Sequence, residues 1–278
     1  TDQDTQAADI AAKELIEKYD LDKDCDVPKF GVGMKELWEI KPENHRPGQV
    51  THSFGWPLTS DVGGGAFMYH GENNQGSIGF VVHLNYKNLY VFPYMEFQRF
   101  KHHPLIAETL KGGKRVAYGA RAITEGGWQS VPKMSFPGGV LLGCAAGLVN
   151  LPRIKGTHNA MLSAIDAAEA AHEAIQAGRQ ADELASFWEA VKSGPIAKDL
   201  KRVRNVKPLW SRFGLWVGVP LGAVDMWCAQ LTGFNIFGTL KHGKTDAEAT
   251  GKAENNKPID YPKPDGVLSF DRLTNVSF

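Results

Sequence analysis

The chain has 278 residues, and its 31 Lys plus Arg balance 31 Asp plus Glu, so the net charge is zero. Binding to nucleic acid through phosphates needs a surplus of basic residues, so this charge argues against nucleic acid as the main partner. The three cysteines, Cys25, Cys144 and Cys228, are too widely spaced for a disulfide framework or a CxxC metal site. The 30 glycines and 15 prolines instead favour a protein rich in turns and ligand-binding loops.

The first 130 residues predict a helix followed by a β-rich region. Apolar residues recur at helical spacing over residues 8–19, with Lys and Glu on the opposite face. Short runs of aromatic and β-branched residues, separated by turn signals, then predict strands. These strands cover residues 30–40, 50–56, 65–70, 77–84 and 114–123, and a short helix is expected at 93–101. The region 28–130 is therefore predicted to form one mostly antiparallel sheet carrying a few helices.

After residue 137 the pattern predicts a buried strand, a glycine-rich turn and a long helix. Val140-Leu141-Leu142 is fully apolar, as in a strand buried on both faces. An alanine-rich helix is predicted from Thr157 to Gln176, and the three elements together make half of a βαβ unit. Further helices are expected at 181–192 and 196–204, an apolar stretch at 210–240, and an extended tail over the last forty residues.

The sharpest local motif is the glycine-rich segment 143–150, Gly-Cys-Ala-Ala-Gly-Leu-Val-Asn, followed by Lys155-Gly156-Thr157. Small residues after a buried strand let a ligand lie against bare backbone, and Thr157 is expected to cap the next helix. The positive end of a helix suits an anionic group or the electron-rich edge of a flavin. Tight packing of the turn against the helix explains the same glycines, so the motif alone leaves both interpretations open.

This turn is similar to the second flavin motif of glutathione-reductase-like FAD proteins, and longer strings resemble the electron-transfer flavoprotein–ubiquinone oxidoreductase family in order along nearly the whole chain. The strings lie at residues 35–38, 97–99, 101–104, 112–115, 118–121, 125–130, 136–139, 239–242 and 261–266. The resemblance implies a mixed α+β and α/β fold. It would hold a partial glutathione-reductase-like FAD domain, a mostly antiparallel quinone-binding insert and a helical membrane-docking segment.

The resemblance also implies a flavin site at the glycine turn. The expected FAD-binding residues are Gly143, Cys144, Ala145, Gly147, Asn150, Gly156 and Thr157. Many related flavoproteins have an aspartate where Cys144 stands, and cysteine is a weaker partner for a ribityl hydroxyl. Asn150 would hydrogen-bond the isoalloxazine, although turn chemistry explains an asparagine in this loop equally well.

For ubiquinone, the resemblance implies contacts with the backbone of Gly64 and Gly65. A glycine pair lets a flat ring approach the main chain. A family member carries tyrosine where this chain has Gly63, so the third glycine is expected to loosen this wall of the pocket. Without the resemblance, a run of three glycines more commonly marks a turn or a bulge.

Two motifs of the family are absent from this sequence: the GxGxxG that binds the FAD pyrophosphate and the cysteines of the 4Fe-4S cluster. Gly31-Val32-Gly33 is followed by Met-Lys-Glu and does not fit the first motif. The expected organisation is therefore an excised middle. Residues 1–27 and 131–178 would belong to the FAD domain, 28–130 would bind ubiquinone, 179–256 would dock on a membrane, and 257–278 would begin an iron–sulfur domain. No metal ligands are expected in this chain.

The resemblance implies an electron-transferring-flavoprotein dehydrogenase. It would pass electrons from reduced electron-transfer flavoprotein, through FAD and a 4Fe-4S cluster outside this chain, to ubiquinone. The isolated chain is expected to bind FAD weakly and to be inactive. The alternatives are another FAD-dependent oxidoreductase, such as an isoprenoid-lipid reductase or an aromatic hydroxylase, or a fragment that docks on a membrane or partner and catalyses nothing.

The apolar stretch at 210–240 determines whether the chain is expected to span a membrane or to lie at its surface. Only residues 213–224 are continuously uncharged, whereas a spanning helix needs about 20 residues, and Pro220 and Asp225 interrupt the stretch further. Aromatic and apolar residues beside a basic flank favour a helix lying in the lipid interface. The expected lipid contacts are Trp210, Phe213, Trp216, Leu221 and Trp227, and the flank is Lys198, Lys201, Arg202, Arg204, Lys207 and Arg212.

A buried core helix explains the same stretch equally well on sequence alone. Because long-tailed ubiquinone resides in the bilayer, the implied function favours monotopic association with a bacterial inner membrane or the matrix face of the mitochondrial inner membrane. Gly214, Gly218 and Gly222, at four-residue spacing, would allow close packing against a neighbouring element.

Overall fold

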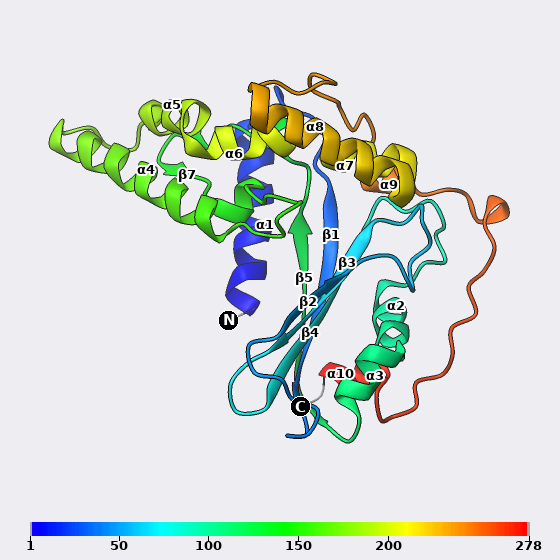
Figure 1. Cartoon of the computed structure of the whole chain (residues 1–278). Coiled ribbons are helices and arrows are strands. Elements are labelled where there is room, and N and C mark those ends of the chain that lie inside the picture. Colours follow the sequence, from blue (N-terminus) through cyan, green and yellow to red (C-terminus); the bar gives the residue numbers. More distant parts are fainter. Residues whose placement is uncertain (1, 277–278) are drawn as a thin grey trace. The chain divides into compact units, whose positions relative to one another are not determined.

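The computed structural model describes residues 2–276, and their side chains from residue 10 onward, as two compact units (Figure 1). Unit 1 joins the chain up to Phe30 to Thr124–Thr245. Unit 2 joins Gly31–Ile123 to the C-terminal segment from Asp246 onward. Both units are therefore discontinuous in sequence, and neither coincides with a single one of the five segments that the sequence analysis distinguished. The FAD, lipid and iron–sulfur assignments of those segments stay predictions.

Unit 2 is built on a five-stranded sheet with the strand order β2-β3-β4-β1-β5 (Figure 1). Neighbours β2 and β3, β3 and β4, and β4 and β1 pair antiparallel, which confirms the predicted antiparallel character. The strands are β1 (Phe30–Glu39), β2 (Val50–Ser53), β3 (Gly64–His70), β4 (Gln75–His83) and β5 (Lys114–Thr124).

One face of this sheet carries the core of unit 2. Strand β3 alternates between buried and half-buried residues, as expected for period-two side chains. Helix α2 (Pro93–Phe100), which begins with a proline suited to the first helical position, packs against β4. The rings of Phe97 and Phe100 lie 6.2 and 5.3 Å from that of Phe80. Helix α3 (Pro104–Leu110) follows directly.

The C-terminal segment belongs to this unit through specific hydrogen bonds. It is mostly extended, as predicted, with only short helical turns: α9 (Asp246–Ala249), η4 (Ala253–Asn255) and α10 (Arg272–Val276). Tyr94 donates its hydroxyl to the carbonyl of Phe270 at 2.6 Å, and the Phe270 N–H donates to Gln98 Oε1 at 2.9 Å. Its last helix therefore ends beside the sheet, where Asn275 donates to Glu36 Oε1 at 3.1 Å.

Glu36 and Lys101, from two of the family-like strings, form a fully buried ion pair in unit 2. Lys101 Nζ lies 2.9 Å from both carboxylate oxygens of Glu36, and Trp38 Nε1 donates to the same carboxylate at 2.8 Å. Burial lowers the pKa of Lys101 to about 8, although Glu36 acts in the opposite direction. Glu36 and Lys101 thus have a structural role in the core of unit 2.

Unit 1 is mainly helical. Its elements are α1 (Asp2–Tyr19), η1 (Trp128–Ser130), β6 (Ser135–Phe136), β7 (Gly139–Val140), η2 (Gly143–Ala146), α4 (Thr157–Gln176), α5 (Ala185–Ser193), α6 (Pro195–Val203), α7 (Val206–Phe213), η3 (Gly214–Gly218) and α8 (Val219–Thr232). The long helix has the predicted bounds. The prediction of a strand at 140–142 buried on both faces is wrong: β7 is a two-residue strand paired antiparallel with β6, and Leu142 is exposed.

Close backbone packing joins α7 and α8, as the glycine spacing predicted. A Cβ added to Gly218 would lie 2.4 Å from the Leu209 carbonyl oxygen, and one on Gly222 would lie 3.3 Å from Val206 Cα. The segment between the helices, η3, forms a turn of π-helix. Within residues 2–276, no helix is long and apolar enough to cross a membrane.

Candidate functional site

The glycine turn of unit 1 is a single tight 3-10 turn, η2, packed on the start of α4. Gly143 and Gly147 adopt positive φ of +55° and +79°, a region that favours glycine. A Cβ on Gly143 would lie 2.9 Å from Ala160 Cβ, and one on Gly156 would lie 3.3 Å from Cys144 Sγ. Close packing of the turn against the helix therefore requires some of these glycines whether or not a ligand binds.

The start of α4 differs from the prediction at Thr157. Gly156, with non-helical φ and ψ, occupies the N-cap position, and Thr157 is the first helical residue. Among the described residues no side chain caps this helix, so the expected cap at Thr157 is wrong. The first N–H groups of an α-helix lack intrahelical acceptors, and an uncapped start keeps its partial positive charge. This arrangement suits an anionic or electron-rich ligand group.

A polar cluster around Asp199 of α6 holds the loop between the turn and the helix. Asn150 is fully buried, and its Nδ2 donates to Asp199 Oδ2 at 3.0 Å, while its Oδ1 accepts from the Arg153 N–H at 3.3 Å. His158 Nε2 and Asn159 Nδ2 lie 3.0 and 3.2 Å from the same Asp199 oxygen. Both polar atoms of the Asn150 side chain thus have protein partners, and its predicted flavin contact stays a prediction.

The cluster also sets the charge state of Asp199. Burial raises the pKa of this carboxyl, but the hydrogen bonds from Asn150, His158 and Asn159 outweigh that effect and bring the pKa below its ordinary value. Asp199 was missed by the sequence analysis because it lies in an ordinary amphipathic helix, more than forty residues after the loop that it binds. No local motif signals such a partner.

One buried atom beside this cluster, Asn159 Oδ1, lacks a hydrogen-bond donor that a ligand could supply. Asn159 is fully buried, and within the part of the chain that the structure describes its Oδ1 accepts no hydrogen bond. Buried acceptors are normally satisfied, so an unpaired one points to a donor that is missing from the protein alone. A hydroxyl-rich chain such as ribityl supplies donors of this kind. The uncapped helix, the bare turn and this atom together fit the inner part of a flavin.

The predicted ubiquinone residues Gly64 and Gly65 open strand β3 of unit 2. A Cβ on Gly64 would lie 2.3 Å from the Val81 carbonyl oxygen and 2.6 Å from Leu58 Cδ1. A Cβ on Gly65 would lie 3.0 Å from the Ser53 carbonyl oxygen. A side chain at Gly64 would therefore collide with the backbone, whereas one at Gly65 would be tight but would need only a small shift. The quinone contact of both residues stays a prediction.

The expectation that Gly63 loosens this wall is wrong. A Cβ at Gly63 would lie only 2.1 Å from Nδ1 of His83, whose residue is 3% exposed. The imidazole of His83 therefore fills the space that the missing side chain leaves. No local sequence pattern indicates this neighbour, because residue 83 lies opposite residue 63 only through the register of strands β3 and β4.

The predicted lipid contacts of unit 1 are unequally exposed. Phe213, Trp216 and Trp227 are 53%, 77% and 63% exposed, whereas Trp210 and Leu221 are half-buried. The structure adds further exposed apolar side chains in η3, in α8 and in the segment that follows α8. These are Val217, Val224, Leu231, Phe234, Ile236 and Phe237. Contact of this apolar surface with lipid stays a prediction.

The basic flank is smaller than predicted, because several of its members have structural roles. Lys207 is buried and pairs with Glu125 at 2.9 Å, so it cannot face lipid. Arg204 Nε donates to the Gly238 carbonyl at 3.0 Å, and Lys201 Nζ lies over the Trp128 ring. Lys198, Arg202 and Arg212 remain exposed, and Arg212 also donates to the Lys241 carbonyl.

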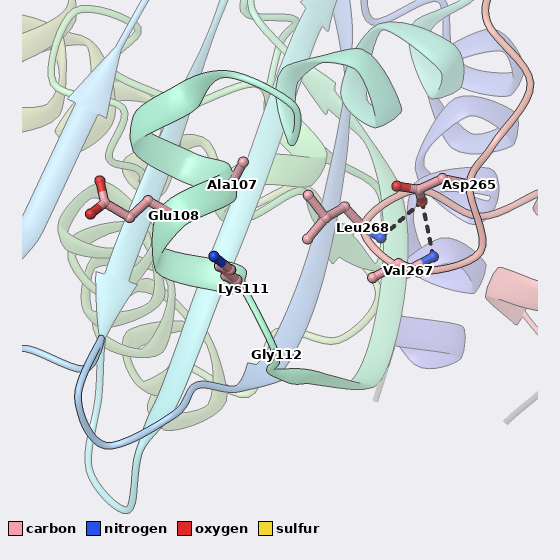
Figure 2. Close-up of a pocket in the computed structure, with 7 residues that line it drawn as sticks. All are labelled: Ala107, Glu108, Lys111, Gly112, Asp265, Val267 and Leu268. Atoms are coloured by element: carbon pink, nitrogen blue, oxygen red, sulfur yellow. Dashed lines mark hydrogen bonds between the residues drawn. The ribbon is translucent and has the colours of Figure 1, made fainter.

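A separate cavity of about 620 Å³ lies in unit 2, between the end of α3 and the C-terminal segment (Figure 2). Its lining is Ala107, Glu108, Lys111, Gly112, Asp265, Val267 and Leu268, and includes none of the predicted site residues. Asp265 Oδ1 accepts the N–H groups of Val267 and Leu268 at 2.9 Å each, as the dashed lines show. The described residues contain no group of three or more His, Cys, Asp or Glu side chains that could hold a metal ion.

Residues 30–123 match the family model described as "ETF-QO, ubiquinone-binding". The chain is 47% identical over 270 residues to the electron transfer flavoprotein-ubiquinone oxidoreductase of Pseudomonas aeruginosa, and 44% identical over 274 residues to the mitochondrial protein of that name from Homo sapiens. These alignments cover 95% and 96% of this chain, but only 48% and 44% of the relatives. The chain thus spans about half the length of these relatives.

Among solved structures, a geranylgeranyl bacteriochlorophyll reductase-like protein from Thermoplasma acidophilum is similar, with a TM-score of 0.55 and 16% identity. The match covers 71% of this chain and 47% of that one. At such low identity, the likeness shows a shared fold alone. The sequence identity to the first relatives, which holds over nearly all of this chain, goes further: the chain belongs to the electron transfer flavoprotein-ubiquinone oxidoreductase family.

Proposed function

We propose that this chain is the part of an electron transfer flavoprotein-ubiquinone oxidoreductase that binds ubiquinone and the isoalloxazine and ribityl parts of FAD. In the whole protein, electrons pass from reduced electron transfer flavoprotein, through FAD and a 4Fe-4S cluster outside this chain, to ubiquinone. The observation that carries the proposal is the 47% identity over 95% of the chain, with the ubiquinone-binding region at residues 30–123.

FAD, when bound, supplies the carrier that accepts and releases electrons. Small residues of the turn would lie against it through their backbone: Gly143, Cys144, Ala145 and Gly147. The uncapped start of α4 at Gly156 and Thr157 would face its electron-rich edge, because a helix start favours negative charge there. Asn159 would accept a hydrogen bond from a hydroxyl, and Asn150 would contact the ring on exchanging one of its present partners.

Ubiquinone would enter from lipid. Its long isoprenoid tail keeps it in the bilayer, so the protein needs an apolar surface that lies in the interface without crossing it. The exposed Trp216 and Trp227 and the apolar residues near them form such a surface in unit 1. We therefore infer monotopic association with a bacterial inner membrane or the matrix face of the mitochondrial inner membrane.

The proposal is tested by titrating the purified chain with ubiquinone-1, a short-tailed quinone, and following tryptophan fluorescence. Saturable quenching is expected, and a saturated ring analogue without carbonyls should produce none. No saturable quenching by a chain that is folded, as judged by circular dichroism, would overturn the assignment of the quinone site to this part of the protein.

A visible spectrum after incubation with FAD and gel filtration tests the flavin assignment. Because no GxGxxG is present in this sequence to hold the pyrophosphate, weak retention of flavin is expected, with loss of the flavin during gel filtration and no turnover with electron transfer flavoprotein. If the chain leaves the fluorescence of added FAD unchanged even at high FAD concentration, the proposed flavin site is contradicted. Stoichiometric retention would contradict the expected weakness.

A further inference from the structure

We propose that unit 2 makes a lipid contact of its own: the loop after strand β2 carries Phe54 and Trp56, which lie in the headgroup region of a neutral phospholipid bilayer. The inference rests on the proposed ubiquinone function and adds a surface to it, because the lipid contacts inferred above all belong to unit 1.

Phe54 and Trp56 expose large aromatic side chains although they are only two positions apart. Phe54 is 66% exposed and Trp56 is 50% exposed. Single exposed apolar residues are ordinary on a protein surface, whereas a group of them marks a contact with a partner or a membrane. The Trp56 ring lies 5.5 Å from that of His103, and Leu105, two positions after that histidine, is also exposed. An apolar patch therefore lies where this loop meets the start of α3.

The loop presents the two aromatic side chains in an ordered conformation. Its other large apolar residues, Leu58 and Val62, are buried in the core of unit 2. The Leu58 N–H donates to the Gly55 carbonyl and the Val62 N–H donates to the Thr59 carbonyl, both at 3.0 Å. Because the loop is anchored at these points, little conformational freedom is lost when its exposed side chains enter an interface.

The loop leaves the sheet beside the glycine pair assigned to ubiquinone. Phe54 directly follows β2, and a Cβ on Gly65 would lie 4.0 Å from Phe54 Cβ. A Cβ on Gly64 would lie 2.6 Å from Leu58 Cδ1. The tail of ubiquinone resides in the bilayer, so the protein surface next to the headgroup site has to meet lipid. Phe54 and Trp56 are exposed apolar side chains in that position.

The chemistry of the loop favours a neutral lipid surface over an anionic one. Residues 53–60 carry no charged side chain, and the exposed Asp61 that follows them is acidic. Anionic lipid attracts segments rich in Lys and Arg, which this loop lacks. Tryptophan is instead enriched at membrane–water interfaces because its ring is apolar and its indole N–H is polar. The contact should therefore be insensitive to salt.

The first test measures quenching of tryptophan fluorescence by phosphatidylcholine vesicles that carry bromine on the upper part of the acyl chains, without quinone. Vesicles of the same lipid without bromine are the reference. Bromine quenches tryptophans that lie in the bilayer, so Trp56→Phe should remove part of the quenching seen with the wild type, at low and at high salt. The matched control is Trp188→Phe, at a half-buried tryptophan of α5, which should leave the quenched emission unchanged.

The second test measures affinity for phosphatidylcholine vesicles by co-sedimentation. Phe54→Glu places a charge in the contact and should weaken binding about tenfold, as expected when one aromatic side chain no longer leaves water. Its melting temperature should match that of the wild type, because the residue is mostly exposed. Val267→Glu, at a valine of unit 2 that is 65% exposed, is the control and should bind normally. Undiminished binding of Phe54→Glu would contradict the contact.

The outcomes separate this inference from the proposed function. Equal quenching of the wild type and Trp56→Phe, or quenching of neither, overturns the lipid contact of this loop. A dimer in analytical ultracentrifugation that Phe54→Glu dissociates would also overturn it, because a second copy would then cover the patch. Titration of the same wild-type chain with ubiquinone-1 tests the proposed function. A chain that binds ubiquinone-1 without quenching at Trp56 loses the inference alone, whereas quenching at Trp56 without ubiquinone-1 binding contradicts the proposed function and leaves the lipid contact standing.

Discussion

Asp199 is the residue on which the conformation of the loop before α4 in unit 1 depends. Its carboxylate accepts hydrogen bonds from Asn150 and Asn159, and it also binds His158 and Arg153. All four partners lie in the loop that precedes α4 or in the first turn of that helix. A single charge on α6 thus fixes the backbone that would face a flavin.

Asp199→Asn should loosen this loop. An asparagine offers one acceptor oxygen in place of two, so buried donors lose their partner and stability should fall by about 2 kcal/mol. Trypsin should then cleave faster after Arg153 and Lys155, as measured by mass spectrometry of the fragments. Glu189→Gln, which removes an exposed ion pair with Lys192, is the control and should leave the cleavage rate unchanged. Equal cleavage of Asp199→Asn and wild type would contradict the role of Asp199.

Asp265 makes a pH-dependent contribution at the edge of the cavity of unit 2. Burial raises the pKa of the Asp265 carboxyl, but the backbone N–H groups of Ser269, Val267 and Leu268 donate hydrogen bonds to it. These hydrogen bonds bring the pKa of Asp265 down to about 2. A carboxyl whose pKa is lower in the folded state stabilises the fold above its ordinary pKa, near 4, and loses that contribution as the pH falls toward 2. The melting-temperature difference between wild type and Asp265→Asn should therefore be constant from pH 7 to 5 and shrink between pH 4 and 2. A difference that does not change with pH would contradict this.

At the scale of elements, α7, η3 and α8 combine a tightly packed inner side with an exposed apolar outer side. Glycines 218 and 222 bring the backbones together, and the buried Asp225 accepts from Asn205 and Asn235 at 3.0 and 2.7 Å. Through Asn235, these hydrogen bonds to Asp225 hold the segment that follows α8. The exposed tryptophans are therefore held on a defined surface.

Trp216→Glu combined with Trp227→Glu should weaken binding to liposomes. Both side chains are mostly exposed, so the double variant should keep the melting temperature of the wild type while placing two charges on the apolar surface. Co-sedimentation with liposomes of mitochondrial or bacterial lipid measures the effect. Ile175→Glu, at an equally exposed apolar residue of α4, is the matched control and should bind normally. Undiminished binding of the double variant would exclude this surface as the lipid contact.

At the scale of the whole molecule, the core of unit 2 is not fully covered without the C-terminal segment. The family model ends at residue 123, but Phe270 and Asn275 bind Tyr94, Gln98 and Glu36. A chain truncated after Thr245 should therefore lose these contacts and expose part of the core of unit 2. Lower thermal stability and increased binding of the dye ANS are expected, with quinone binding weakened in parallel. A truncated chain with an unchanged melting profile would show that the segment adds no stability.

The sequence predicts periodic and local features well and tertiary partners poorly. The helix Thr157–Gln176 has the predicted bounds because its apolar period is long and a glycine precedes it. The antiparallel sheet follows from period-two runs separated by turns. Lys207 was assigned to a lipid-facing flank, but it is buried against Glu125, because a basic residue in a helix carries no local sign of a distant carboxylate.

The glycines of the candidate site could be predicted from the sequence, whereas the side chains that contact them could be identified only in the structure. Resemblance to a family identified residues 64–65 and 143–157, while Asp199 and His83 became visible only through side-chain contacts. The cap at Thr157 was mispredicted by one residue, since a glycine can also occupy the N-cap position. Such errors arise where two local solutions have similar energies.

Because unit 2 is divided in sequence, the ribosome synthesises its two parts at different times. Its sheet is complete once Ile123 has been made, but 122 residues of unit 1 are synthesised before the segment that begins at Asp246. During that interval Trp38 and the pair of Glu36 and Lys101 lack the cover that Phe270 and Asn275 later provide. The nascent sheet thus stays partly uncovered until the segment from Asp246 onward emerges, and substitutions in that segment should reduce yield in cells more than they reduce the stability of the finished protein.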